Sequence, residues 1–112
     1  MTEVTVFRSH RDGGRIAGFE AQGHTDFAES GNDIVCAAVS ILTQCAVMGI
    51  TEYLHEDCAR DISDGHIYCM LPRDISENAW REAEIILETM AMGLKSLAGT
   101  YGDYIKLIER EV

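Results

Sequence analysis

The stretch GHTDFAESGNDIVCAAVS, residues 23–40, contains the point at which the chain changes from a polar loop to an apolar helix. Residues 23–32 are polar, contain two glycines and follow neither a helical nor an alternating apolar period. From Asp33 the chain continues as IVCAAVSILTQCAVMGITEYL, residues 34–54, which is apolar around most of a helical circumference. We therefore expect a central helix that begins at Asp33, with Asn32 or Asp33 as its N-terminal cap.

Upstream of this loop the pattern predicts a β-hairpin. Residues 3–8 alternate in the manner of a strand, and residues 15–21 are again extended. Asp12-Gly13-Gly14 lies between them and provides the residue types that a tight reversal needs.

Downstream, the pattern predicts a second hairpin, a long helix and a last strand. Residues 58–71 turn at Asp64-Gly65 and are closed by Pro72. An amphipathic helix is then expected to begin at Asp74 or Ser76 and to end at Gly99 and Gly102, before a strand at residues 104–108. The order β-β-α-β-β-α-β predicts an α+β fold in two layers, in which two long helices cover one face of a mostly antiparallel sheet.

The length and charge of the chain indicate its number of domains and the kind of partner it can bind. With 112 residues and no internal linker, residues 1–112 are expected to form a single domain. The formal net charge of -10 repels nucleic-acid phosphates and attracts a basic peptide, so we expect no direct nucleic-acid partner.

The N-terminus and the apolar run decide the expected location. MTEVTVFRSH lacks the organisation of a signal peptide, so we expect a cytoplasmic protein. Residues 34–50 approach the length of a membrane span but include Ser40, Thr43 and Gln44, and have no Lys or Arg beside them. A buried helix is therefore favoured over a membrane span.

The four cysteines are expected to be free thiols. They stand at Cys36, Cys45, Cys58 and Cys69, an even number without a secretory context. The pairs His55/Cys58 and His66/Cys69 raise the possibility of zinc, but His66 and Cys69 fall in a predicted strand, where residues three apart point to opposite faces. We expect core thiols and surface histidines, with no metal and no cofactor.

Cys36 and His24 are candidates for thiol chemistry. A cysteine is a nucleophile only as thiolate, and Cys36 is expected about one turn into the helix, where the macrodipole favours negative charge. His24 could act as its base, and the N–H groups of the first helical turn are candidate donors to an oxyanion. Spacing alone leaves open that Cys36 is a small core residue and His24 a solvated one. Asp33 could orient His24 or cap the helix, and Ser40 lies one turn beyond Cys36.

These residues closely resemble a known signature. GHTDFAESGNDIVCAAVS is similar to the motif of the Prp family, the ribosomal-processing cysteine proteases of bacteria. The wider order is also similar: a leading strand VTVFR, the Gly-His loop, the helix DIVCAAVS, a hairpin that ends in proline, and a last helix followed by YGDYIKL. The likeness covers most of the chain, although only the central eighteen residues are specific. Thr25 and Phe27 depart from the usual family residues, and neither change removes a catalytic group.

The resemblance implies an activity and a set of site residues. It implies a cysteine endopeptidase that removes the N-terminal extension of large-subunit ribosomal protein twenty-seven, cutting after an aromatic residue ahead of a basic stretch. Cys36 is implied as the nucleophile and His24 as the general base, with Gly23, Asp33 and Ser40 as supporting residues. The family is also implied to form homodimers.

Alternatives remain open for the function and for one role in the site. The chain could be a ribosome-assembly factor that holds a basic ribosomal tail without cutting it. A redox role is disfavoured because the sequence has no C-x-x-C motif. Asp33 is the first candidate to orient His24, and Asp26 or Glu29 could serve instead.

Overall fold

The computed structural model describes residues 1–23 and 30–112, and it describes the side chains of the second range from residue 34 onward. Within these residues the predicted order of elements is confirmed. The elements are β1 (Thr2–Ser9), β2 (Arg15–Gly23), α1 (Ser30–Met48), η1 (Gly49–Tyr53), β3 (Ala59–Ser63), β4 (His66–Met70), α2 (Glu77–Thr100) and β5 (Ile105–Glu111). The element η1 is a π-helical turn that directly continues α1.

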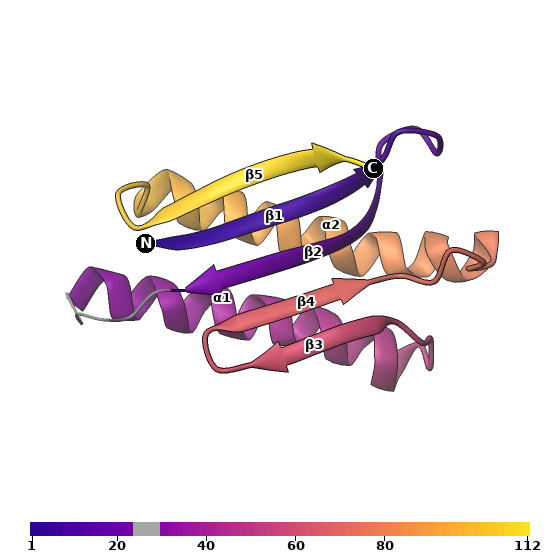
Figure 1. Ribbon diagram of the computed structural model, residues 1–112, viewed down its shortest axis with the longest axis horizontal. Coiled ribbons are helices and arrows are strands. Elements are labelled where there is room, and N and C mark those ends of the chain that lie inside the picture. The colour runs from indigo at the N-terminus through magenta and orange to yellow at the C-terminus, as the bar shows by residue number, and fades with distance from the viewer. Residues whose placement is uncertain (24–29) are drawn as a thin grey trace.

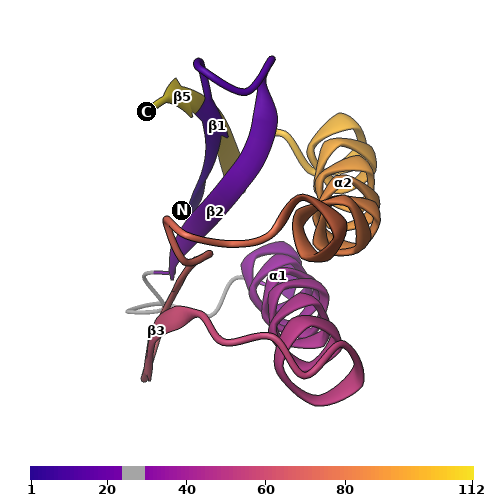
Figure 2. The same ribbon diagram turned by 90° about the vertical axis from the view of Figure 1, so that its right-hand side faces the viewer.

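The strands form one sheet in the order β3-β4-β2-β1-β5 (Figure 1). The β1–β2, β2–β4 and β3–β4 pairs are antiparallel, whereas β1 and β5 are parallel. Both α1 and α2 lie on the same face of this sheet, side by side (Figure 2). The predicted two-layer α+β architecture with a mostly antiparallel sheet is therefore confirmed.

The core lies between the sheet and the two helices. Alternate residues of the strands point toward the helices, because successive side chains of a strand face opposite sides. The strand residues of this core include Val4, Val6, Phe19, Ala21, Ile67 and Cys69, and the helices contribute Val35, Val39, Leu87 and Leu94. All of these side chains are buried.

The start of α2 is held by a cap and by ion pairs to β2. The Ser76 hydroxyl accepts a hydrogen bond from the Ala79 N–H at 3.1 Å, as the capping signal predicts. The Arg15 guanidinium donates to both carboxylate oxygens of Glu77 at 2.9 Å and lies 5.0 Å from the centre of the Trp80 ring. These contacts fix α2 against the hairpin.

Several element boundaries differ from the prediction because pairing with distant residues extends the elements. Gly23, predicted as loop, ends β2, where it pairs with Thr2 and donates its N–H to the Gly65 carbonyl at 2.8 Å. β5 continues to Glu111 rather than to residue 108, since it pairs along β1 as far as Arg8. Helix α2 passes through Gly99 and ends at residue 100.

The start of α1 also differs from the prediction. The helix begins at Ser30, three residues before the predicted start at Asp33. Cys36 is therefore the seventh residue of the helix, nearly two turns in, rather than about one turn.

Helix α1 is apolar on its outward face as well as its inward face. The segment Ile34–Tyr53 has a mean hydropathy of 2.0 and is long enough to cross a membrane, a test that core helices of soluble proteins also pass. Only 33% of that apolar window is buried, although α1 packs on the sheet and on α2. Ile34, Ile41 and Met48, each seven residues apart, are exposed along the outer side. We call these three residues the outer stripe of α1.

Candidate active site

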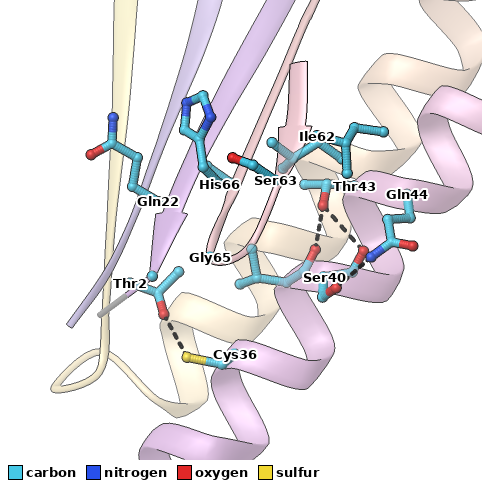
Figure 3. Close-up of a pocket in the computed structure, with 14 residues that line it drawn as sticks. Thr2, Gln22, Cys36, Ser40, Thr43, Gln44, Ile62, Ser63, Gly65 and His66 are labelled. Carbon is cyan, nitrogen blue, oxygen red and sulfur yellow. Dashed lines mark hydrogen bonds between the residues drawn. The ribbon is translucent and has the colours of Figure 1, made fainter. Parts of the chain in front are cut away.

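A cleft lies between α1 and the neighbouring ends of β2, β3 and β4 (Figure 3). Its volume is about 120 Å³. One set of lining residues is apolar and comprises Ala21, Val39, Ile62 and Ile67. The polar lining residues include Thr2, Cys36, Ser40, Thr43, Gln44, Ser63 and His66. The cleft therefore presents an apolar wall with polar groups along the helix and at the strand ends.

Cys36 lines this cleft near the ends of β1 and β2. Its side chain is half-buried, and its Sγ lies 3.2 Å from the Thr2 Oγ1. Figure 3 marks this contact with a dashed line. A Cβ at Gly23 would lie 3.6 Å from the same sulfur. Because Gly23 has no side chain, the space beside the sulfur stays open. The structure thus brings Gly23 and Cys36 together, as two residues of the predicted site.

Ser40 continues the cleft one turn beyond Cys36. Its hydroxyl accepts a hydrogen bond from the Gln44 side-chain amide at 2.7 Å. Cys36, Ser40 and Gln44 are spaced by four residues and form a polar row along α1 (Figure 3). Gln44 was not predicted as a site residue, although the same spacing that relates Ser40 to Cys36 also relates Gln44 to Ser40.

Three residues of the predicted site fall where the structure gives no description. His24, Asp26 and Glu29 lie outside the described residues. Asp33 lies in the first turn of α1, but its side chain is outside the described part. The roles assigned to these residues stay predictions.

Because α1 begins earlier than predicted, the N–H groups expected to donate to the oxyanion lie at a different distance from Cys36. The N–H groups without a partner inside a helix are those of its first four residues, here residues 30–33. Cys36 lies beyond them, so its own N–H belongs to the interior of the helix. The first-turn amides are therefore further from the Cys36 sulfur than the sequence predicted.

A second imidazole lines the cleft at the start of β4. The His66 Nε2 lies 2.8 Å from the Glu20 Oε2, and its Nδ1 is 4.0 Å from the Asp61 carboxylate. In the sequence His66 was weighed as a zinc ligand, and a surface histidine was favoured. Its closest polar partner is instead a carboxylate on the neighbouring strand β2.

The histidine and cysteine of β4 do not share a face. His66 is half-buried, whereas Cys69 is fully buried among core residues. Burial raises the pKa of the Cys69 thiol, and the neighbouring Cys58 raises it further, so this thiol is inert. Among the residues that the structure describes, no three His, Cys, Asp or Glu side chains converge as metal ligands.

The family model, the sequence relatives and the solved structures that match this chain all point to the same family. Residues 1–106 match the family model described as cysteine protease Prp. The ribosomal processing cysteine protease Prp of Bacillus subtilis (strain 168) is 31% identical over 109 residues, 96% of each chain. The crystal structure of an essential ribosomal processing protease Prp from S. aureus with a substrate peptide has a TM-score of 0.83 and 26% identity, covering 98% of this chain and 100% of that one. The S. aureus protease with a covalently linked product peptide has a TM-score of 0.80 and 27% identity at the same coverage.

Proposed function

The chain belongs to the Prp family of cysteine proteases, and from this we propose that it removes the N-terminal extension of large-subunit ribosomal protein twenty-seven. The names of its relatives as ribosomal processing proteases support a ribosomal protein as the substrate. The observation that carries the proposal is the half-buried Cys36 thiol in a cleft between α1 and the strand ends.

In this proposal Cys36 is the nucleophile. Its sulfur is accessible from the cleft, and Cys36 is the cysteine among the residues that line the cleft. The other cysteines are poor candidates, because Cys58 and Cys69 are buried in the core and Cys45 does not line the cleft. The covalent product peptide bound to the S. aureus relative supports covalent catalysis in the family.

His24 is proposed as the general base and acid. The residue that precedes it, Gly23, lies beside the Cys36 sulfur, which supports a short path between the imidazole and the thiol. A thiol and an imidazole within hydrogen-bond reach form the usual activated pair of a cysteine protease. Asp33 is proposed to orient His24, with Asp26 and Glu29 as alternatives.

The proposed reaction has two steps. The Cys36 sulfur attacks the carbonyl carbon of the substrate's aromatic residue, after which the chain is cut. The carbonyl oxygen becomes an oxyanion. His24 transfers the thiol proton to the leaving amine, the C–N bond breaks, and an acyl-enzyme remains. Water, deprotonated by His24, then hydrolyses the thioester and restores the thiol.

The lining of the cleft fits a peptide with an aromatic residue and a basic segment. Ala21, Val39 and Ile67 form an apolar wall near Cys36 that suits an aromatic side chain. Ser40 and Gln44 offer polar groups to the main chain of an extended peptide along α1. The net charge of -10 favours the encounter with a basic segment, most strongly at low salt.

We also propose that the protein acts in the cytoplasm as a homodimer. The outer stripe of α1, Ile34, Ile41 and Met48, supports this, because heptad spacing of exposed apolar residues is the pattern with which helices pair. A second copy of the same helix would remove this apolar surface from water.

Intact mass spectrometry of the ribosomal substrate tests the proposed reaction. The full-length substrate is incubated with the wild-type protein, Cys36→Ala, His24→Ala and, as a matched control on α1, Cys45→Ala. We expect loss of the N-terminal extension with the wild type and Cys45→Ala only. An unchanged mass with folded wild-type protein and a substrate shown to bind would support the non-cutting assembly factor instead.

A further inference from the structure

Within the described residues, the Cys36 sulfur has a polar contact to the first strand, which lies outside the central eighteen-residue family motif. The Thr2 Oγ1 lies 3.2 Å from the Cys36 Sγ, and the Thr2 side chain is only 2% exposed. The backbone of Thr2 is held on both sides, because it pairs with Gly23 on β2 and donates its N–H to the Tyr104 carbonyl at 3.0 Å. The hydroxyl is therefore fixed in position relative to the sulfur.

Thr2 places a polar hydroxyl on the side of β1 that faces the helices, where its neighbours are apolar. Thr2, Val4 and Val6 alternate along the helix-facing side of β1, and all three are buried. The two valines pack in the core, whereas the residue nearest the nucleophile carries a polar atom. A buried hydroxyl without a hydrogen-bond partner costs free energy, so this position requires an acceptor or donor beside it.

The other buried threonine of the cleft shows the contrast. Thr43, on α1, donates its hydroxyl to the Val39 carbonyl at 2.7 Å, the usual local bond of a helical threonine. Among the described residues, the Thr2 hydroxyl has the Cys36 sulfur as its hydrogen-bond partner. When Cys36 is a thiol, either group can donate; when it is a thiolate, only the hydroxyl can donate.

We propose that Thr2 is a positioning residue that donates a hydrogen bond to the Cys36 thiolate and holds its sulfur at the mouth of the open space beside Gly23. Hydrogen bonds to an ionised partner are stronger than those between neutral groups, so the contact favours the thiolate over the thiol. The Thr2 proton stays on its oxygen throughout, and the thiol proton goes to the general base. The inference rests on the proposed role of Cys36 as nucleophile.

The test measures the reactivity of the Cys36 thiol directly. The wild type, Thr2→Val, Thr2→Ser and Thr5→Val are alkylated with iodoacetamide from pH 5 to pH 10, and the modification of Cys36 is followed by peptide mass spectrometry. For Thr2→Val we expect alkylation of Cys36 about tenfold slower at pH 7, with its pH midpoint moved upward, because a hydrogen bond to the charged sulfur is lost. Thr2→Ser keeps the hydroxyl and should restore the wild-type profile.

Two controls separate the hydrogen bond from packing. Thr5→Val makes the same change at another buried threonine of β1 and should leave the Cys36 profile unchanged. Cys45, exposed on the same helix, serves as an internal reference thiol whose rate should be equal in all variants. A Thr2→Val profile identical to the wild type overturns the proposal, and so does a Thr2→Ser profile that matches Thr2→Val.

The alkylation test needs no ribosomal substrate, so it separates this inference from the proposed function. A shifted Cys36 profile in a protein that cuts no ribosomal substrate would keep the role of Thr2 and overturn the proposed function. An unchanged profile in an active protease would do the reverse.

Discussion

Helices α1 and α2 lie side by side on the same face of the sheet, yet they are built for different tasks (Figure 2). The side of α2 toward the β1–β2 hairpin is charged, and Arg8 and Arg15 of the hairpin bind its acidic residues Glu77, Glu84 and Glu88. From Ile34 to its end at Met48, α1 carries no charged residue. Its polar groups face the cleft, and its outer stripe is apolar.

The two helices also differ in what surrounds their exposed apolar residues. In α2 the core residues Leu87 and Leu94 are fully buried, while Ile85 and Met92 are 68% and 69% exposed, with the charged Glu88 one turn from each. In α1 Ile34 and Ile41 are also more than half exposed, but no charged residue stands between them. We infer that α2 stabilises the fold, whereas α1 carries the reaction on one side and an interface on the other.

The largest expected effect is the loss of activity in Cys36→Ala. Because the proposed nucleophile is removed, we expect cleavage to fall by at least about a thousandfold. The melting temperature should fall by only a few degrees, because the buried Thr2 hydroxyl loses its partner. Cleavage of the ribosomal substrate is measured beside thermal unfolding. Cys45→Ala on the same helix should retain activity, and a similar loss in that variant would contradict the assignment of chemistry to the cleft side of α1.

A substitution in the core face of α2 should affect stability and leave the chemistry intact. Leu87 is fully buried, so we expect Leu87→Ala to lower the free energy of unfolding by about 2–5 kcal/mol. Urea denaturation measures the change, with cleavage assayed at low temperature on the folded fraction. Ile85→Ala, at a position 68% exposed on the same helix, should change stability by less than about 0.5 kcal/mol. Equal costs at the two positions would show that the outer side of α2 is also covered.

A charge in the outer stripe of α1 should change the oligomeric state. Ile41 is 59% exposed in the single chain, so Ile41→Lys should fold normally and disrupt a dimer that pairs the α1 helices. Light scattering after gel filtration gives the mass of the wild type and the variant. Ile85→Lys on α2 is the matched control, and a dimer that survives Ile41→Lys but not Ile85→Lys would assign the interface to α2.

The smallest expected effect concerns the ion pair at the start of α2. Hydrogen bonds from Arg15 lower the pKa of the Glu77 carboxyl, and the positive charges of Arg15 and Arg81 lower it further. The carboxylate therefore contributes stability that is present above its unfolded pKa, about 4.3, and is lost as the pH falls through the lower folded pKa. Arg15→Gln should be slightly less stable than the wild type at pH 7.

Denaturation at several pH values tests this last prediction. The difference between Arg15→Gln and the wild type should shrink as the pH falls below about 4, because Glu77 becomes protonated in both proteins. A difference that stays constant down to pH 2 would attribute the contribution of Arg15 to its stacking on Trp80 instead.

Local sequence patterns predicted which helices and strands form better than they predicted the residues at which these elements begin and end. The period of α2 and its Ser76 cap are properties of neighbouring residues, so they could be found in the sequence. The extension of β2 to Gly23 depends on partners on other strands, Thr2 and Gly65, and no local pattern contains that information. Likewise, α1 begins at Ser30, so polar residues that were predicted as loop form the first turn of the helix.

The site divides in the same way. Cys36 was singled out as a thiol near the predicted start of an apolar helix, and Ser40 as the residue one turn beyond it. Gly23 was identified from the family motif. Thr2 was missed, since it is separated from Cys36 by 34 residues and is ordinary as a strand residue. Its relation to the sulfur arises only when β1 and α1 pack together.

The sequence by itself therefore determined the order of elements, the two-layer class and the family, because periodicity, turn residues and a specific motif are local properties of the chain. Only the tertiary structure decided which groups meet at the Cys36 sulfur, how far α1 extends before it, and which side of that helix stays exposed. These features depend on contacts between residues distant in the chain, and such contacts form only when strands and helices pack together.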